Sequence, residues 1–328
     1  MPNILITGIT GFVGSHLADF CLAEGHVVHG FRRYHLSNMR NVGHIGARIK
    51  WFDCDMSDPK SVMKAIDAIR PDVVFHMASQ SFVSPSWDHP TLYMDANYKM
   101  TVHLLEACLH SKINPKVHIP GSGEEYGEVT EAELPIREST VMRPVNPYAV
   151  TKIAQDLIAY VYFRSYGLNV IRTRAFNHEG PRRDKVFGIP WYAYQVARIE
   201  RGLQEPVVQV GHIDDRRNFT HVTDMVRAYW LAVEKCTPGE LYLVGSDRES
   251  DTFTFRNALE QLIAMSTVPG IRYETVPQYV RPTQVPRLIC DPSKFVAVTG
   301  WQPTLGFETI LRDTLAYWRA ELDANPLR

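Results

Sequence analysis

The segment Gly8-Ile9-Thr10-Gly11-Phe12-Val13-Gly14 separates an apolar run, Asn3–Thr7 (NILIT), from a helical pattern over residues 12–24. Three glycines at this spacing let the backbone turn tightly and approach a ligand closely, and the N-terminus of the following helix favours an anion. A glycine-rich turn without a ligand would share the motif, but its position after a first buried strand is that of a dinucleotide pyrophosphate site. We therefore expect a cofactor at Gly8, Gly11, Phe12, Val13 and Gly14.

Outward from this turn, short β-branched runs alternate with helical segments through the first half of the chain. Strands are expected at His26–Phe31, Ile49–Phe52, Asp72–Met77, Lys116–Ile119 and Asn169–Arg174. Helices are expected after Asp58-Pro59, over about 92–110 and over about 147–166. This alternation predicts a parallel sheet of six or seven strands with helices on both faces.

The second half of the chain is less regular. Helices are expected at about 190–202, 223–235, 254–266 and 306–322. Strands are expected at Val207–Val210, Leu241–Val244 and Arg272–Val276. The predicted fold is α/β, a Rossmann doubly wound parallel sheet with a smaller mixed C-terminal domain. We place a cofactor-binding domain at 1–176 and a mostly substrate-binding domain at 177–328, and expect residues 208–238 to return to the first domain.

The composition narrows the class of partner. The chain has 328 residues, with 35 Lys and Arg against 36 Asp and Glu, so its formal net charge is −1. Nucleic acid or an anionic membrane would call for an excess of basic groups, so neither is expected as a partner. No run approaches the ~18 apolar residues of a membrane span, and the N-terminus lacks a signal-peptide pattern. Five cysteines without a CxxC pair fit a reducing compartment, so we expect a cytoplasmic protein. Thirteen histidines form no HExxH motif, and no metal site is expected.

The end of the second predicted strand bears on the choice of cofactor. It reads His29-Gly30-Phe31-Arg32-Arg33 and holds no carboxylate for a ribose 2′-hydroxyl. Arg32 and Arg33 instead suit a 2′-phosphate, which favours NADP, although a solvated basic turn would read the same. Asp55 and Met56 follow the third strand and are candidates for holding the adenine; an ordinary approach to a helix accounts for them equally well.

Tyr148 and Lys152 stand four residues apart in a predicted helix and so share a face. An ammonium beside a phenol would lower the pKa of the phenol and make it a better base. This spacing alone is common, but Ser122 lies upstream just after a predicted strand. The glycine turn, Ser, Tyr and Lys in this order resemble the extended short-chain dehydrogenase/reductase superfamily. The resemblance implies that Tyr148 is the base, that Lys152 holds the nicotinamide ribose, and that Ser122 assists at the substrate oxygen.

Glu124 adds a carboxylate two residues after the serine, in Gly121–Gly127. Hydride transfer does not need it, but elimination of water next to a ketone requires a base at the neighbouring carbon. The segment resembles the S/T-x-E-x-Y-G pattern of sugar-nucleotide 4,6-dehydratases, which implies that Glu124 is the elimination base. Gly123 departs from members that carry Asp or Ser there. Related 4-ketoreductases also carry Glu, and a surface-loop carboxylate is a further explanation.

Four more segments resemble the GDP-mannose 4,6-dehydratase family, and together with the motifs above they extend the resemblance over essentially the whole chain. They are Arg32–His44, Arg174–Arg183, Asp215–Phe219 and Arg281–Pro303. The resemblance implies that the first binds NADP and reaches toward a neighbouring subunit, in a homodimer or homotetramer. It also implies that Asn177, Arg217 and Arg281 contact the phosphates of a nucleotide sugar, which suits the forked geometry of guanidinium groups.

Ala78-Ser79-Gln80-Ser81 follows the fourth predicted strand, at the sheet edge where ligands bind in such folds. Ala78 is a candidate for the cofactor and Ser81 for the sugar hydroxyls; ordinary loop polarity is the alternative. We expect conversion of GDP-mannose, or a close GDP-hexose, to GDP-4-keto-6-deoxyhexose by internal hydride transfer through NADP. The alternatives are a GDP-4-keto-6-deoxyhexose 4-reductase, a sugar-nucleotide epimerase, or a non-catalytic NADP-sensing protein on the same fold.

Overall fold

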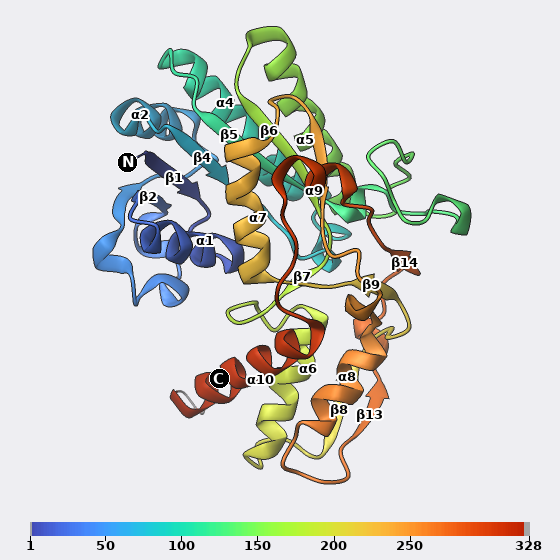
Figure 1. Cartoon of the computed structure of the whole chain (residues 1–328). Helices are drawn as coiled ribbons and strands as arrows, with labels where there is room; N and C mark the ends of the chain where they lie inside the picture. Colours follow the sequence, from blue (N-terminus) through green and yellow to red (C-terminus); the bar gives the residue numbers. More distant parts are fainter. Residues whose placement is uncertain (1, 325–328) are drawn as a thin grey trace.

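A computed structural model describes residues 2–324 and contains a central parallel sheet of seven strands (Figure 1). The strand order is β11-β6-β5-β4-β1-β2-β3, with β1 (Asn3–Thr7) near the middle. The other strands are β2 Val27–Arg32, β3 Lys50–Asp53, β4 Val73–His76, β5 Lys116–Ser122, β6 Val170–Ala175 and β11 Leu241–Val244. The predicted α/β class and doubly wound sheet are confirmed.

Both faces of the sheet are covered by helices because successive side chains of each strand point to opposite sides. Ile4 and Ile6 face a core shared with one group of helices, and Leu5 faces the core of the other. The first group is α1 Phe12–Ala23, α7 Val222–Lys235 and α9 Ser293–Thr299. The second group is α2 Pro59–Ile69, α4 Met100–His110 and α5 Pro147–Tyr166. As expected, Asp58 caps α2 by accepting from the backbone N–H of Lys60.

One expected helix differs in detail. The segment predicted as a single helix over 92–110 consists of α3 (Pro90–Met94), a π-helical turn (Asp95–Lys99) and α4. Such turns insert a residue and rotate the side chains that follow. Here the turn directs Asn97 inward, where its side chain bonds both backbone polar groups of Gln80 and the hydroxyl of Thr151.

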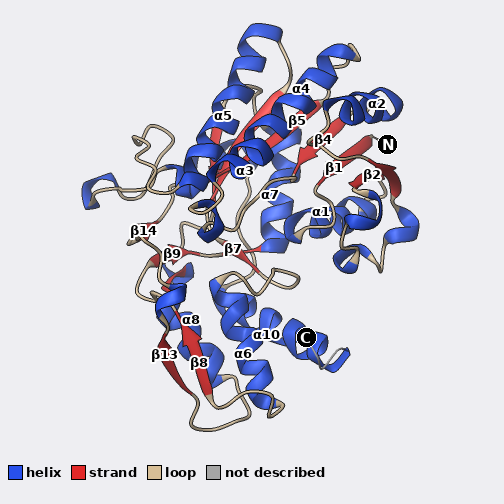
Figure 2. Ribbon diagram, turned by 180° about the vertical axis from the view of Figure 1, so that it is seen from behind, coloured by secondary structure: helices blue, strands red, loops and turns tan. Residues whose placement is uncertain are grey.

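The remaining elements form a smaller lobe with its own apolar core, visible below the main sheet in Figure 2. Its helices are α6 Gly188–Glu200, α8 Phe255–Ala264 and α10 Phe307–Ala324, and its paired strands are β8 Val207–Val210 and β13 Arg272–Thr275. Helix α7 packs against β5 of the sheet, β11 pairs with β6 in the sheet, and β8 pairs with β13 in the smaller lobe. The two-domain division itself stays a prediction.

Short strands that the sequence did not reveal connect the two lobes. They are β7 His178–Glu179, β9 Arg216–Asn218, β10 Thr220–His221, β12 Thr252–Thr254 and β14 Arg287–Leu288. β9 lies between β12 and β14, and β7 pairs with β10. These pairings place residues 215–221 beside the carboxyl end of the large sheet.

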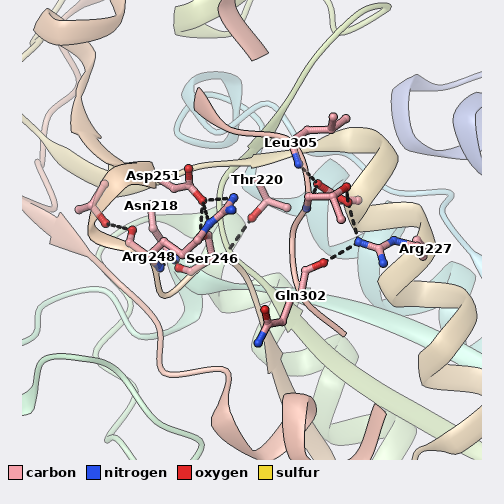
Figure 3. Close-up of polar contacts among 11 residues, drawn as sticks. Asn218, Thr220, Arg227, Ser246, Arg248, Asp251, Gln302 and Leu305 are labelled. Carbon is pink, nitrogen blue, oxygen red and sulfur yellow. Dashed lines mark hydrogen bonds and ion pairs between the residues drawn. The ribbon is translucent and has the colours of Figure 1, made fainter. Parts of the chain in front are cut away.

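A polar network fixes the chain where it passes between the lobes (Figure 3). The carboxylate of Asp224, near the start of α7, accepts from the backbone N–H groups of Thr304 and Leu305 at 2.7 and 2.8 Å. The hydroxyl of Ser246, just after β11, donates to Asp251, and its N–H donates to Thr220 Oγ1 at 3.1 Å. The carbonyl oxygen of Ser246 accepts from the side-chain amide of Asn218. Both lobes are therefore held to the carboxyl end of the sheet.

Among the described residues, no helix combines the length and apolarity that crossing a bilayer requires. The same part of the chain contains no group of three or more His, Cys, Asp or Glu side chains arranged to hold a metal ion.

Candidate active site

A cavity of about 730 Å³ opens where the carboxyl end of the sheet meets the smaller lobe. It collects most of the residues that the sequence singled out, from segments far apart in the chain. They are Gly8, Gly11, Phe12, Val13, Gly14, Ser81, Ser122, Glu124, Tyr148, Lys152, Asn177, Arg217 and Arg281. Five predicted cofactor residues do not line it: Arg32, Arg33, Asp55, Met56 and Ala78.

The glycine turn fits a pyrophosphate because its backbone leaves space that any Cβ atom would fill. Gly8 has a φ of +63°, and a Cβ there would lie 2.6 Å from the backbone nitrogen of Ala78. A Cβ at Gly14 would lie 2.4 Å from the carbonyl oxygen of Gly8. Gly11 begins α1 without a side-chain cap, so the first N–H groups of the helix face the cavity mouth uncovered.

At the end of β2, Arg32 has a partner that the sequence did not reveal. Its Nε lies 2.9 Å from Oδ1 of Asp53, the residue opposite it on β3. The neighbouring strand thus supplies a carboxylate that orients the guanidinium. Arg33 is exposed. Burial alone would raise the pKa of Asp55, but hydrogen bonds from Ser57 and the charge of Arg33 lower it overall.

Other residues for which a cofactor or subunit contact was predicted also have partners within this chain. Met56 is 5% exposed and lies in the core beneath the sheet. Arg40, in the segment that the family resemblance assigns to a subunit contact, donates to the hydroxyl of Tyr317 on α10. His44 Nε2 lies 2.8 Å from Asp19 of α1.

Ser122, Tyr148 and Lys152 meet at the centre of the cavity. Ser122 ends β5, and its hydroxyl faces the phenol of Tyr148 near the start of α5. Lys152 is buried one turn later; its Nζ donates to the carbonyl of Pro120 at 2.5 Å and to the side chain of Gln155.

The electrostatics of this pair differ from the simple expectation. Burial raises the pKa of Tyr148, the Ser122 hydrogen bond opposes this, and the charges of Glu124 and Glu125 add to the rise. Burial lowers the pKa of Lys152 to about 8. In this arrangement desolvation outweighs the effect expected from Lys152, and the phenol is a weaker acid than usual.

Glu124 lies beside this pair, half-buried in the turn after β5. Its Oε2 accepts a hydrogen bond of 3.1 Å from the side-chain amide of Asn146. The departure at Gly123 has a steric reason, since a Cβ there would lie 3.1 Å from the ring of Phe176, closer than ordinary van der Waals contact.

Arg217 and Arg281 reach the cavity from different segments and share a recess with Glu124, and Asn177 lines the same cavity. Arg217 is 3% exposed and lies 3.6 Å from the carboxylate of Asp215. Asp215 also lines the cavity, and burial raises its pKa. It was not predicted as a site residue, because nothing in its local pattern distinguishes it from a surface carboxylate.

Two further groups of lining residues were not predicted. Glu179 and Arg183 form a 3.0 Å ion pair, and the Arg183 guanidinium lies over the ring of Phe187 at 3.9 Å. Trp191 and Tyr279 pack with their ring centres 5.7 Å apart and their planes tilted by 58°, on the small-lobe side. The first pair belongs to a segment already quoted for its family resemblance. Trp191 lies in α6 and Tyr279 ends a short 3-10 helix, and neither belongs to a motif.

Comparisons with known proteins agree with this geometry. A family model described as GDP-mannose 4,6 dehydratase matches residues 5–314. The chain is 30% identical to GDP-mannose 4,6 dehydratase 2 of Caenorhabditis elegans, over 98% of this chain and 90% of that one. It is 32% identical to GDP-mannose 4,6 dehydratase 1 of Arabidopsis thaliana, over 94% and 87%.

Solved structures with the same fold include an NADPH complex and an epimerase. RMD from Pseudomonas aeruginosa complexed with NADPH has a TM-score of 0.84 and 28% identity, covering 98% of this chain and all of that one. UDP-glucose 4-epimerase from Thermotoga maritima has a TM-score of 0.86 and 26% identity, covering 98% and 99%.

Proposed function

The chain belongs to the GDP-mannose 4,6-dehydratase family, and on this basis we propose that it converts GDP-mannose, or a close GDP-hexose, to GDP-4-keto-6-deoxyhexose. One observation carries the proposal: Glu124 stands in the same cavity as the Ser122–Tyr148 pair. A hydride-transfer enzyme needs only the pair, whereas elimination of water also needs the carboxylate.

The residues divide the reaction between them. Tyr148 takes the proton of the C4 hydroxyl while Ser122 hydrogen-bonds the same oxygen. The C4 ketone acidifies the proton at C5, which Glu124 removes, and hydroxide leaves C6 as water. Glu124 returns a proton to C5, so the proton lost with water balances the one taken from the C4 hydroxyl. Bound NADP would supply the acceptor for the C4 hydride and the donor of that hydride to C6, so that no external reductant would be consumed.

NADP is the cofactor we propose, held by the glycine turn and Lys152. The 2′-phosphate would bind at the end of β2, to Arg32 and to the exposed Arg33. The ion pair with Asp53 orients the guanidinium of Arg32. Ala78, Asp55 and Met56 stay proposed as neighbours of the adenosine half. The NADPH complex of the Pseudomonas aeruginosa relative, on the same fold, supports this assignment.

The substrate would lie with its diphosphate between Arg217 and Arg281, beside Asn177, and its sugar between Ser81 and Glu124. Two guanidinium groups reaching the cavity from separate segments match a diphosphate in charge and geometry.

We also propose a homo-oligomer and a cytoplasmic location. Helix α5 exposes an apolar stripe of Val150, Leu157 and Val161, each 45–46% exposed, which a second copy of the chain would cover. All five cysteines are unpaired, which supports a reducing compartment.

Incubation of the purified protein with GDP-mannose and NADP, without added reductant, tests the proposed function. The expected product has lost one water and carries a C4 ketone and a C6 methyl group. An epimerase would leave the mass unchanged, and a 4-ketoreductase would instead consume NADPH and GDP-4-keto-6-deoxyhexose in equal amounts. Tyr148→Phe and Glu124→Gln should each lower turnover by roughly 10²- to 10⁴-fold.

A further inference from the structure

Asn146 touches two parts of the active site at once, although no motif singles it out. Its side-chain oxygen accepts from the backbone N–H of Ala149 at 2.8 Å and so caps α5. Its side-chain nitrogen donates to Oε2 of Glu124 at 3.1 Å. Asn146 is 7% exposed, so both bonds are shielded from water.

These two bonds complete a closed ring of contacts. The backbone N–H of Glu124 donates to Ser122 Oγ at 3.2 Å, and that hydroxyl faces Tyr148, two residues beyond Asn146. The ring therefore links the group proposed for elimination to the pair proposed for oxidation, through β5 on one side and α5 on the other.

The surroundings of Glu124 explain why a neutral donor matters. From α5 it faces Tyr148, and from the smaller lobe it faces Arg217 and Asp215. Arg281 lines the same recess. In the described part of the chain, however, no ion pair joins Glu124 to either arginine. A guanidinium bound to the carboxylate would hold it strongly but weaken it as a base, whereas an amide orients it and leaves it basic.

We propose that Asn146 is a positioning residue for the elimination step, holding the Glu124 carboxylate toward C5 while fixing the start of the helix that carries Tyr148. This inference rests on the proposed function, because it assigns Asn146 to one step of that reaction.

Two substitutions separate the two bonds. Asn146→Ser keeps a good helix cap but has no amide to reach Glu124. Asn146→Asp keeps the cap and places a second carboxylate beside Glu124, and the two like charges would repel each other. Asp58→Ser, which exchanges the cap of the distant helix α2, is the matched control.

We expect Asn146→Ser to keep the KM of the native protein and lose roughly 10- to 100-fold in kcat, the cost of a misplaced catalytic group. In a single turnover the first hydride transfer should keep its rate, so reduced cofactor accumulates at 340 nm before product forms. The acid limb of the kcat–pH profile should move to higher pH in Asn146→Ser, and further in Asn146→Asp, whose activity recovers at alkaline pH. Asp58→Ser should leave all three readouts unchanged.

The proposal is overturned if Asn146→Ser keeps native kcat and pH profile, or if it slows the first hydride transfer as much as overall turnover. The latter result would mean that Asn146 does not act selectively on the elimination step. If the native protein makes no ketosugar, the proposed function fails instead. A titration of Glu124 by ¹³C NMR, its signal identified by its absence in Glu124→Gln, then decides the inference: the same midpoint in native protein and Asn146→Ser would sink it.

Discussion

Arg174 Nε lies 2.7 Å from Oε2 of Glu125, and these two side chains are only 4% and 0% exposed. Arg174 also pairs with buried Asp156 at 2.7 Å, and the other oxygen of Glu125 accepts from the backbone N–H of Ser122 at 2.7 Å. A buried ionic network therefore supports the turn that carries Ser122 and Glu124 from behind.

Removing the charge of Glu125 should destabilise the fold, because it leaves part of a buried guanidinium unpaired. We expect Glu125→Gln to lower the free energy of unfolding by about 3 kcal/mol, measured by urea titration. Lys99→Ala breaks an exposed pair with Asp95, both side chains 57% exposed, and should cost less than about 1 kcal/mol. Equal losses in the two variants would contradict a structural role for the network.

Cofactor choice should depend on the basic end of β2. A charge-assisted hydrogen bond is worth ~1.5–3 kcal/mol, so Arg33→Ala should weaken NADP binding about 10- to 100-fold. Affinity for NAD should stay the same, because NAD lacks the 2′-phosphate. Calorimetric titration with both cofactors measures this, with the exposed Lys60→Ala as control. A parallel loss for NAD and NADP would argue against the 2′-phosphate assignment.

Buried histidines should make the protein sensitive to acid. Desolvation lowers the pKa of His16 and His178 to about 4 and of His76 and His118 to about 3. Below pH 6.5 these rings take up protons in the unfolded chain but not in the folded one. The free energy of unfolding therefore decreases as the pH is lowered. Burial raises the pKa of Glu125 and Glu179 to about 7, which acts in the opposite direction but involves fewer groups.

The free energy of unfolding should therefore rise as pH increases from about 4.5 to 6.5. In His76→Gln the slope should fall by about 1.4 kcal/mol per pH unit, the contribution of one proton. Loss of packing in the variant should lower the free energy of unfolding at every pH without changing its slope against pH. The slope is therefore the quantity to compare, measured by urea titrations at a series of pH values. An unchanged slope would mean that His76 is not neutral in the folded protein.

The apolar stripe on α5 gives the proposed oligomer a direct test. Leu157→Arg places a charge at its centre and should reduce the mass measured by light scattering to that of one chain, 37.4 kDa. Glu260→Arg, on exposed α8 of the other lobe, should keep the native mass. An oligomer that survives Leu157→Arg would place the contact elsewhere.

The sheet was predictable because its strands, apart from the partly exposed edge strand β3, are short and largely buried runs between helical segments. The strands that were missed, β7, β9, β10, β12 and β14, have two or three residues, too few to show a period. The π-helical turn before α4 was hidden for a different reason, since one inserted residue barely changes the apolar pattern.

The residues of the candidate site also fall into those that the sequence predicted and those that it did not. Glycine turn, Ser122, Tyr148 and Lys152 were predicted because their roles follow from local spacing. Asn146 and Asp53 were not predicted, because their roles depend on partners distant in the sequence. Asn146 donates to Glu124, 22 residues away, and Asp53 accepts from Arg32 on the neighbouring strand. Such contacts exist only once the strands and helices are assembled.

The central claim is that one active site moves a hydride from C4 to C6 of the sugar. GDP-mannose carrying deuterium at C4 tests it directly, by NMR and mass spectrometry of the product formed without added reductant. The account predicts that the deuterium appears in the C6 methyl group of a 4-ketosugar. Deuterium retained at C4, lost to solvent, or found on released cofactor would contradict it.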